Sequence, residues 1–306
     1  MELLDVLARR RSVRRFKPLP LPEEDLEKLL FALQRAPTDA SAQLYSAIRV
    51  RDPRLRDEVA RLSGDQEHIR QAAEFFLFLA DVHRLERLLA HRGQRMAFWP
   101  RTALHFAILD AGIAASYLAL TAEALGYGVC FIGGVLDGVE TLTDLLGLPP
   151  GVLPVVGLAV GVPDEEGPPR RRLPRRLVVH EDRYRPYAAE DLEEAYRAMA
   201  PYSRVGDWNR VLRRYFAEGG TMEAREKPYG KVLSRQGFDP DLPKGAPFYS
   251  LGALLEEALA EARGVLFRKG EVWLEEEARA FRGEGRPGEA LLMALRKARG
   301  EVPDWP

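Results

Sequence analysis

The sequence has 306 residues, of which 46% are hydrophobic and 30% are charged, and its formal net charge at pH 7 is −1. This composition fits one large folded domain, or one domain with an appendage, and it excludes a mainly disordered chain. The balanced charge argues against a nucleic-acid binder, and the single cysteine, Cys130, excludes an intramolecular disulfide framework and a cysteine-based zinc cluster.

The most apolar long stretch of the sequence covers residues 103–126 and contains His105, Asp110 and Glu123. These polar residues favour a helix buried in the protein over a membrane span. The first five residues are acidic and amphipathic, which is not the pattern of a signal peptide. We therefore expect a soluble, cytoplasmic protein that binds neither membrane nor nucleic acid.

The spacing of apolar residues predicts helices that alternate with a few short strands. Proline and acidic residues mark where helices begin, and proline or glycine marks where they end. Strands this few, separated by helices, indicate an α+β fold in which helices cover a small sheet. Helices are expected at residues 3–10, 22–36, 53–63, 103–125 and 137–146, and strands at 45–51, 75–80, 128–132, 153–162 and 177–179.

The last third of the chain is more polar, and from Ala188 onward its pattern is helical. Two prolines and a glycine mark residues 239–246 as a linker, and helices are expected beyond it at 249–263 and 287–299. No chemical motif appears there. The sequence therefore predicts a main domain at residues 1–240 and a helical C-terminal extension of unknown role at 241–306.

Several common catalytic motifs are missing from the sequence. It has no Gly-x-Ser-x-Gly elbow, and His180-Glu181 is followed by Tyr184 where a zinc protease would have its second histidine. A dinucleotide-like pattern beginning at Gly126 has Phe131 at its third glycine position. A standard serine, zinc or phosphate-loop enzyme is therefore disfavoured.

Positive charge is concentrated in two loops, residues 9–16 after a short helix and residues 170–176 after a buried strand. Each loop alone also fits a solvated basic surface or an RNA-binding patch. Two features favour a phosphorylated, planar ligand instead. The Ser12 hydroxyl and nearby amides can join arginines around a phosphate. The pair Gly133-Gly134 after a strand lets a flat ligand approach the backbone.

The residues Arg10-Arg11-Ser12-Val13-Arg14-x-Phe16 resemble the opening motif of the nitroreductase-like FMN proteins. The sequence is most similar to the NADPH-dependent group of oxygen-insensitive nitroreductases and flavin reductases. This resemblance covers about residues 1–240, because further motifs of that group recur in the same order. They are Ala36-Pro37-Thr38 with Gln43, residues 62–68, residues 131–134, Leu153-Pro154, and Arg172-Leu173-Pro174.

The resemblance implies a nitroreductase-like α+β homodimer with FMN at each of two subunit interfaces. Such a subunit has a small, mostly antiparallel sheet flanked by helices, with a long central helix. The residues matched to the FMN site by position are Arg10, Arg11, Ser12, Arg14, Thr38, Gln66, Phe131, Ile132, Gly133, Gly134, Arg170 and Arg172.

Within that set, the first four residues are expected to hold the phosphate and the polar edge of the flavin. Thr38 is expected to reach FMN from the partner subunit, Gln66 to bond the ring or ribityl chain, and residues 132–134 to line the ring near N5. Arg170 and Arg172 replace a Lys-x-Arg pair of the family, and their register is open by one residue because three arginines are consecutive. A planar guanidinium in place of an ammonium is a departure from the family pattern.

Arg204 and Lys227 match positions at which the related enzymes bind NADPH, although both also suit a charged surface. The implied activity is an FMN-dependent oxidoreductase that takes hydride from NADPH and reduces nitroaromatics, quinones or free flavin in a ping-pong cycle. No catalytic side chain or metal is expected, because FMN N5 carries the hydride. The alternatives are a dedicated NADPH–flavin reductase, a non-catalytic flavin-binding regulatory module and, more remotely, a nucleic-acid binder.

Overall fold

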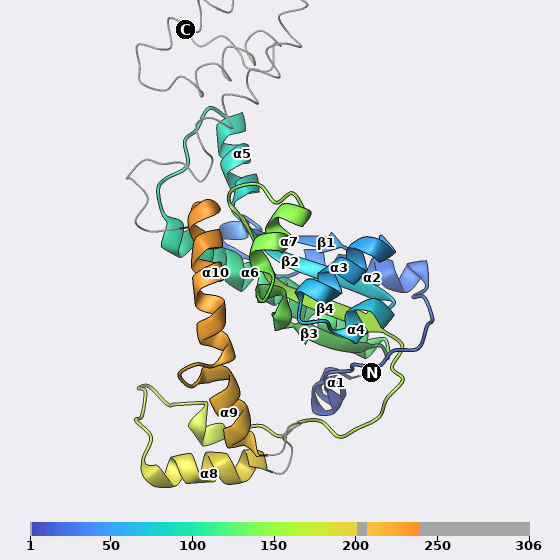
Figure 1. The fold of residues 1–306 in the computed structure, drawn as a ribbon, viewed down its shortest axis with the longest axis vertical. Coiled ribbons are helices and arrows are strands. Elements are labelled where there is room, and N and C mark those ends of the chain that lie inside the picture. The colour runs from blue at the N-terminus through green and yellow to red at the C-terminus, as the bar shows by residue number, and fades with distance from the viewer. Residues whose placement is uncertain (1, 201–206, 239–306) are drawn as a thin grey trace, which may run out of the picture.

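A four-stranded sheet in the order β1-β2-β4-β3 organises residues 2–200 and 207–238, which are the residues described in this computed structural model (Figure 1). Every neighbouring pair of strands is antiparallel, so the predicted small antiparallel sheet is confirmed. The predicted linker and extension, residues 239–306, lie outside the described residues. The strands are β1 (Tyr45–Arg49), β2 (Glu74–Asp81), β3 (Gly128–Ile132) and β4 (Val152–Gly161).

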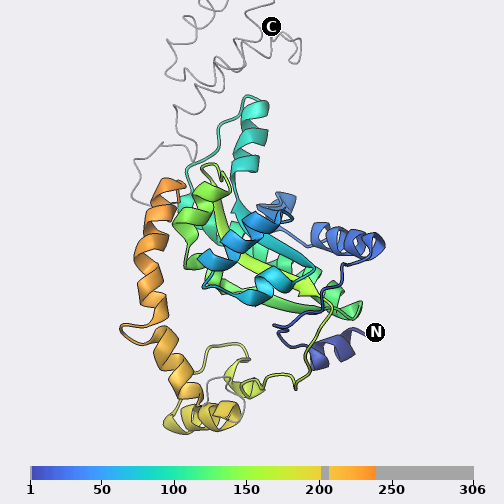
Figure 2. The same cartoon turned by 45° about the vertical axis from the view of Figure 1, so that its right-hand side comes forward.

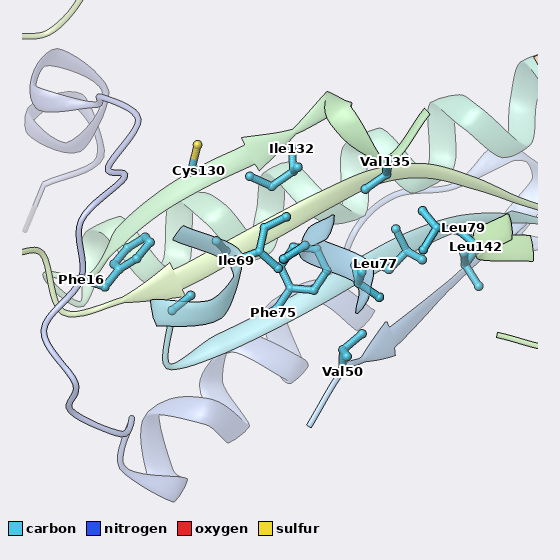
Figure 3. Close-up of a cluster of buried hydrophobic side chains, with 14 of the residues drawn as sticks. Phe16, Val50, Ile69, Phe75, Leu77, Leu79, Cys130, Ile132, Val135 and Leu142 are labelled. Atoms are coloured by element: carbon cyan, nitrogen blue, oxygen red, sulfur yellow. The ribbon is translucent and has the colours of Figure 1, made fainter. Parts of the chain in front are cut away.

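Strand β2 is buried along its whole length, and its side chains alternate between two hydrophobic clusters. Phe75, Leu77 and Leu79 enter one cluster, and Figure 3 shows them together with Ile132 and Val135. Phe76 and Phe78 enter the cluster on the opposite face. The sheet is therefore a central layer with a core on each side.

Helices cover both faces of this central layer (Figure 1). The face containing Phe75 is covered by α3 (Pro53–Leu62), α4 (Glu67–Gln71) and α7 (Val139–Leu145). The opposite face is covered by α2 (Glu23–Gln34) and α6 (Pro100–Ala124). The short helix α5 (His83–His91) follows β2.

Helix α6 is the predicted long central helix. By length and composition it could cross a membrane, but a run of alanines along it packs into the core beside the sheet. Small side chains let the helix axis come close to the strands. The helix is apolar on more than one face because it is buried on more than one side. Asp110 is the one carboxylate among the fully buried residues of this helix.

The N-terminal basic segment lies along the end of the sheet. It follows α1 (Leu3–Arg9), and the backbone N–H of Val13 donates to the carbonyl of Val129 in β3 at 2.9 Å. Farther along, the N–H of Lys17 donates to the carbonyl of Val162, directly after β4, also at 2.9 Å. This pairing fixes the first arginine cluster beside β3 and beside the loop that leaves β4.

The predicted edge strand at residues 177–179 is wrong. The chain there forms a short 3₁₀ helix, Arg175–Leu177, and Val178 and Val179 are exposed. Arg176 bonds to Asp191 and Glu194 of α8 (Ala189–Met199), so this segment is tied to the helical region and not to the sheet. Adjacent β-branched residues favour a strand only where a neighbouring strand is available to pair.

Helices α8 and α9 (Trp208–Phe216) lie away from the sheet, and α10 (Thr221–Arg235) returns along α7 (Figures 1 and 2). The helix expected at residues 137–146 begins later, as α7 at Val139, and Asp137 pairs with Arg225 at 2.6 Å. Two further ion pairs join α10 to α7, Lys231 with Glu140 at 3.5 Å and Arg235 with Asp144 at 3.0 Å.

The end of α10 is fixed to the start of β4 by Gln236, whose side chain is buried. Its amide Nε2 donates to the carbonyl oxygens of Leu148 at 3.3 Å, Pro149 at 3.2 Å and Val152 at 2.8 Å. Its own backbone carbonyl accepts from the N–H of Gly151 at 2.9 Å. These bonds anchor the helix that carries Lys227.

Replacing this amide with a carboxylate should destabilise the fold. In Gln236→Glu an oxygen faces three carbonyl oxygens, so the donor is lost and repulsion replaces it. We expect the free energy of unfolding to fall by about 2 kcal/mol or more, measured by urea denaturation. The control is Gln94→Glu, at an exposed position, which should change stability by less than about 0.5 kcal/mol. Equal stability of the two variants would contradict the anchoring role of Gln236.

Candidate functional site

The first basic cluster is organised by Glu165, in the loop that follows β4. The Glu165 carboxylate accepts the backbone N–H of Arg14, and the Glu165 backbone carbonyl accepts from the guanidinium of Arg11. The guanidinium of Arg15 lies 3.7 Å from the same carboxylate. The structure therefore joins the segment after α1 to the loop from which the second arginine cluster extends.

Two side chains of this segment remain available for a ligand. The guanidinium of Arg14 and the hydroxyl of Ser12 are partly exposed, and neither forms a hydrogen bond or ion pair with another described residue. Ser12 is held by its backbone, which forms a bridge with Val129 of β3. A cation beside a hydroxyl on a fixed backbone is a suitable arrangement for binding a phosphate.

A second carboxylate, Glu123 of α6, lies under the same segment. Burial raises the pKa of Glu123 to about 7, while the charge of Arg10 and the backbone N–H of Arg11 act in the opposite direction. Its Oε2 atom is buried and has no hydrogen-bond partner among the described residues. The Glu123 carboxyl group therefore lies close to Arg10 and Arg11 of the first arginine cluster.

The glycine pair after β3 adjoins Gln66. A Cβ at Gly134 would overlap Gln66 Nε2 and the carbonyl oxygen of Ser63, whereas a Cβ at Gly133 would meet nothing within 4 Å. Glycine at position 134 is therefore required by packing within the chain. Gly133 leaves an open stretch of backbone, and Gln66 Nε2 is fixed by donating to Ser63 O at 2.6 Å.

The two residues before the glycines differ in what they can offer a ligand. Phe131 is exposed at the surface of β3, and the Ile132 side chain is buried in the hydrophobic cluster of Figure 3. Only the backbone of Ile132 can therefore face a ligand.

The loop that begins at Thr38 has an unusual backbone. Ala40, Ser41 and Gln43 have φ angles of 46°, 57° and 53°, in the left-handed region that non-glycine residues rarely adopt. The Thr38 hydroxyl oxygen accepts the N–H of Gln43 at 3.2 Å, which closes the loop on itself. We call residues 38–44 the Thr38 loop.

Two charged side chains anchor the Thr38 loop. The carboxylate of Asp110 in α6 accepts the N–H of Asp39 at 3.1 Å and the N–H of Leu44 at 2.9 Å. The guanidinium of Arg84 in α5 donates to the carbonyl oxygens of Gln43 and, at 2.6 Å, Tyr45. Sequence reasoning missed both anchors. The one available signal was the isolated carboxylate in an apolar helix.

The second arginine cluster is exposed in this structure. Arg170 and Arg172 lie at the surface, and the Arg172 guanidinium donates to the backbone carbonyls of Arg170 and Arg171 at 3.1 Å each. The chain places these residues a few positions beyond Glu165, and the bonds of the Arg172 guanidinium stay within its own loop. Their role toward a ligand therefore stays a prediction.

Of the two predicted NADPH-binding residues, Arg204 lies outside the described residues. Lys227 is exposed on α10 and forms no hydrogen bond or ion pair with another described residue. Its ammonium group is therefore accessible to an anion in solution.

The available groups lie at opposite ends of one strand. Ser12 and Arg14 lie beside Val129 at the start of β3, and the open backbone of Gly133 follows its end. Four residues of extended chain, about 13 Å, separate them. That arrangement fits FMN, an elongated ligand with a phosphate at one end and a flat ring at the other. Within the part of the chain described, no three His, Cys, Asp or Glu residues gather as a metal site.

Comparison with known proteins shows the family of this chain. The model of the nitroreductase family matches residues 7–162, which include every residue predicted to bind FMN except Arg170 and Arg172. The chain belongs to the nitroreductase family. Family membership makes it an oxidoreductase, and it accounts for the α+β fold with a small antiparallel sheet.

Two curated relatives are similar over most of their length. An FMN reductase (NADPH) of Bacillus subtilis is 33% identical over 183 residues, which are 59% of this chain and 74% of the relative. An oxygen-insensitive NADPH nitroreductase of Salmonella typhimurium is 32% identical over 243 residues, which are 77% of this chain and 97% of the relative.

A solved structure supports the same assignment. The NADPH:FMN oxidoreductase of Vibrio harveyi, complexed with NAD⁺, superposes with a TM-score of 0.68 and 26% identity. The match covers 77% of this chain and 97% of that chain. The structural match therefore covers a larger share of this chain than residues 7–162.

The two glycines offer a matched pair of substitutions. Gly134→Ala should lower the thermal midpoint by several degrees, because its Cβ collides with Gln66 and with the Ser63 backbone. Gly133→Ala should melt like the wild type, because open space surrounds its Cβ. Differential scanning calorimetry of both variants measures this. Similar melting of the two would show that position 134 has no special packing requirement.

Proposed function

We propose that this protein is an FMN-dependent oxidoreductase that takes hydride from NADPH and reduces nitroaromatics, quinones or free flavin in a ping-pong cycle. The observation that carries the proposal is the pair of available groups at the two ends of β3, Ser12 with Arg14 and the open Gly133. A dedicated NADPH–flavin reductase is the second candidate, favoured by the name of the Bacillus subtilis relative.

The chain's own residues bind and orient the cofactor. When bound, FMN supplies hydride acceptance and donation at its ring, so the protein needs no nucleophile of its own. Arg14 and Ser12 hold the phosphate by charge-assisted and hydroxyl hydrogen bonds. The open backbone at Gly133 admits the ring. Arg170 and Arg172 supply positive charge that favours the reduced ring, which is more negative.

Gln66 has a defined orientation toward this site. Its Nε2 is committed to the Ser63 carbonyl and packs against Gly134. The Oε1 atom is therefore the one left to accept a hydrogen bond from the ring or the ribityl chain. A glutamate at this position would place an oxygen against the Ser63 carbonyl, so an amide is the suitable side chain.

The active form in this proposal is a homodimer, in which the Thr38 loop of one subunit reaches the FMN of the other. Large apolar side chains remain exposed on two helices of a single subunit, and a second copy of the chain would cover them. They are Leu3, Leu4 and Leu7 on α1, and Leu109 and Tyr117 on α6.

The remaining parts of the proposal concern the chain as a whole. Residues 1–240 form the FMN-binding domain, and residues 241–306 add an extension of unknown role. The enzyme acts in the cytoplasm on small-molecule acceptors and contacts neither membrane nor nucleic acid. The formal net charge of −1 supports the part of this assignment that concerns nucleic acid, because the chain has no overall positive charge to attract one.

Flavin retention tests the cofactor site. Purified wild-type protein should be yellow and should bleach when NADPH is added under nitrogen. The double variant Arg14→Ala, Arg172→Ala should lose most of its flavin on gel filtration, because two charge-assisted contacts are removed, each worth roughly a factor of ten or more in affinity. Arg35→Ala, an exposed arginine at the end of α2, is the control.

Three outcomes of that experiment are informative. Full flavin content in the double variant would remove the two arginines from the site. Wild-type protein without flavin would refute the proposed function. Flavin that is bound but not bleached by NADPH would favour the regulatory module over the enzyme.

Donor kinetics test the role of Lys227. The 2′-phosphate of NADPH is a compact dianion that a nearby cation selects. Lys227→Ala should raise KM for NADPH roughly ten-fold and leave KM for NADH nearly unchanged, in steady-state assays with both donors. Lys231→Ala is the control on the same helix, where an exposed pair with Glu140 contributes little. Equal losses with both donors would exclude Lys227 from the NADPH site.

A further inference from the structure

The Thr38 loop has a backbone that the chain does not adopt without support. Three of its non-glycine residues, Ala40, Ser41 and Gln43, have positive φ angles. Each such residue costs on the order of 1 kcal/mol or more, and such conformations persist only where the surroundings enforce them. Backbone strain of this kind indicates that the shape of the loop is being held, so its anchors are the residues to identify.

Asp110 anchors both ends of this loop. Its two carboxylate oxygens accept different backbone amides: Oδ1 binds the N–H of Asp39, and Oδ2 binds the N–H of Leu44. The side chain is only 1% exposed, in a helix whose other buried residues are almost all alanine and leucine. Burying a carboxylate among such residues is costly unless it is hydrogen-bonded, and here both oxygens are.

The chemistry of this anchor requires an acid. A carboxylate has two acceptor oxygens, whereas asparagine has one acceptor and one NH₂ group that would face a backbone N–H. An asparagine at position 110 would therefore keep one of the two loop bonds and oppose the other. An aliphatic residue would keep neither and would leave the buried N–H of Leu44 unpaired.

In the loop held in this way, the hydroxyl group of Thr38 still has its proton available to donate. The hydroxyl oxygen of Thr38 accepts from Gln43, so its own proton can be donated outward. Arg84 holds the far end through the carbonyls of Gln43 and Tyr45. The position of Thr38 therefore depends on Asp110 on one side and Arg84 on the other.

We propose that Asp110 is a positioning residue for FMN binding, whose carboxylate fixes the Thr38 loop in the shape that presents Thr38 to the flavin of the partner subunit. Asp110 itself contacts no ligand. This inference rests on the proposed function, since it requires that the protein binds FMN and that the loop reaches it.

Three variants test the proposal in the full-length, FMN-loaded protein. Asp110→Asn removes one of the two loop bonds while keeping the size of the side chain. Ser41→Pro alters the loop without touching the core, because proline fixes φ near −65° where the loop needs 57°. Asp52→Asn is the matched control, since Asp52 caps α3 by accepting the N–H of Leu55 at 2.8 Å, away from the loop.

Three measurements are made on each variant. The first is the rate at which FMN leaves after dilution, followed by the recovery of free-flavin fluorescence. The second is amide hydrogen exchange at Asp39 and Leu44. The third is the thermal midpoint of the FMN-free protein.

We expect FMN to leave Asp110→Asn and Ser41→Pro roughly ten-fold faster than the wild type, a change that corresponds to the loss of one charge-assisted hydrogen bond. Exchange at Asp39 and Leu44 should accelerate in Asp110→Asn. The core amides of β2 should stay protected in both variants. Asp52→Asn should release FMN at the wild-type rate, whatever it does to the midpoint.

Each other outcome overturns the proposal. Wild-type FMN release from Asp110→Asn, with loop exchange accelerated, would show that the loop does not matter to the flavin. Wild-type release from Ser41→Pro would show the same, even if Asp110→Asn failed to fold. Faster release from Asp52→Asn would assign the effect to general instability. A wild-type protein that carries no FMN refutes the proposed function first and is distinguished from all of these.

Discussion

The packing of α6 against the sheet is the constraint on which the rest of the structure depends. Alanines along the helix let it lie close to the strands, and it also contacts α1 and α2. Two carboxylates of this helix, Asp110 and Glu123, lie about 20 Å apart along its axis. Asp110 holds the Thr38 loop, and Glu123 lies under the basic segment at Arg10 and Arg11. One core helix thus positions two distant parts of the candidate site.

Much of the fold could be predicted because its signals are local. The apolar run of β2 and the long apolar stretch of α6 appear directly in the sequence, and both elements form where expected. The predictions that were wrong depended on distant partners. Val178 and Val179 look like strand residues but have no strand beside them among the described residues. Asp137, the first residue of the helix expected at 137–146, pairs with Arg225, 88 positions away, and lies outside α7.

In the candidate site, too, residues within local motifs could be predicted, whereas residues that act on distant segments could not. Resemblance identified Gln66 and the glycines, and the structure brings Gln66 against Gly134. It did not identify Glu165 or Asp110, because each acts on a segment more than 60 residues away. The sequence also could not explain the glycine at position 134, because the reason is the closeness of the Ser63 carbonyl, which only the folded structure shows.

Charge balance explains how the basic segment can be ordered before a ligand binds. Five arginines lie within residues 9–15, and their mutual repulsion would favour an extended, mobile chain. The Glu165 carboxylate offsets part of this charge, the carboxyl group of Glu123 lies near Arg10, and the bridge to β3 fixes the backbone. The guanidinium of Arg14 is left unpaired among the described residues on this fixed backbone, beside the Ser12 hydroxyl. A phosphate can therefore bind to Arg14 without first breaking an ion pair, so its binding energy is not reduced by that cost.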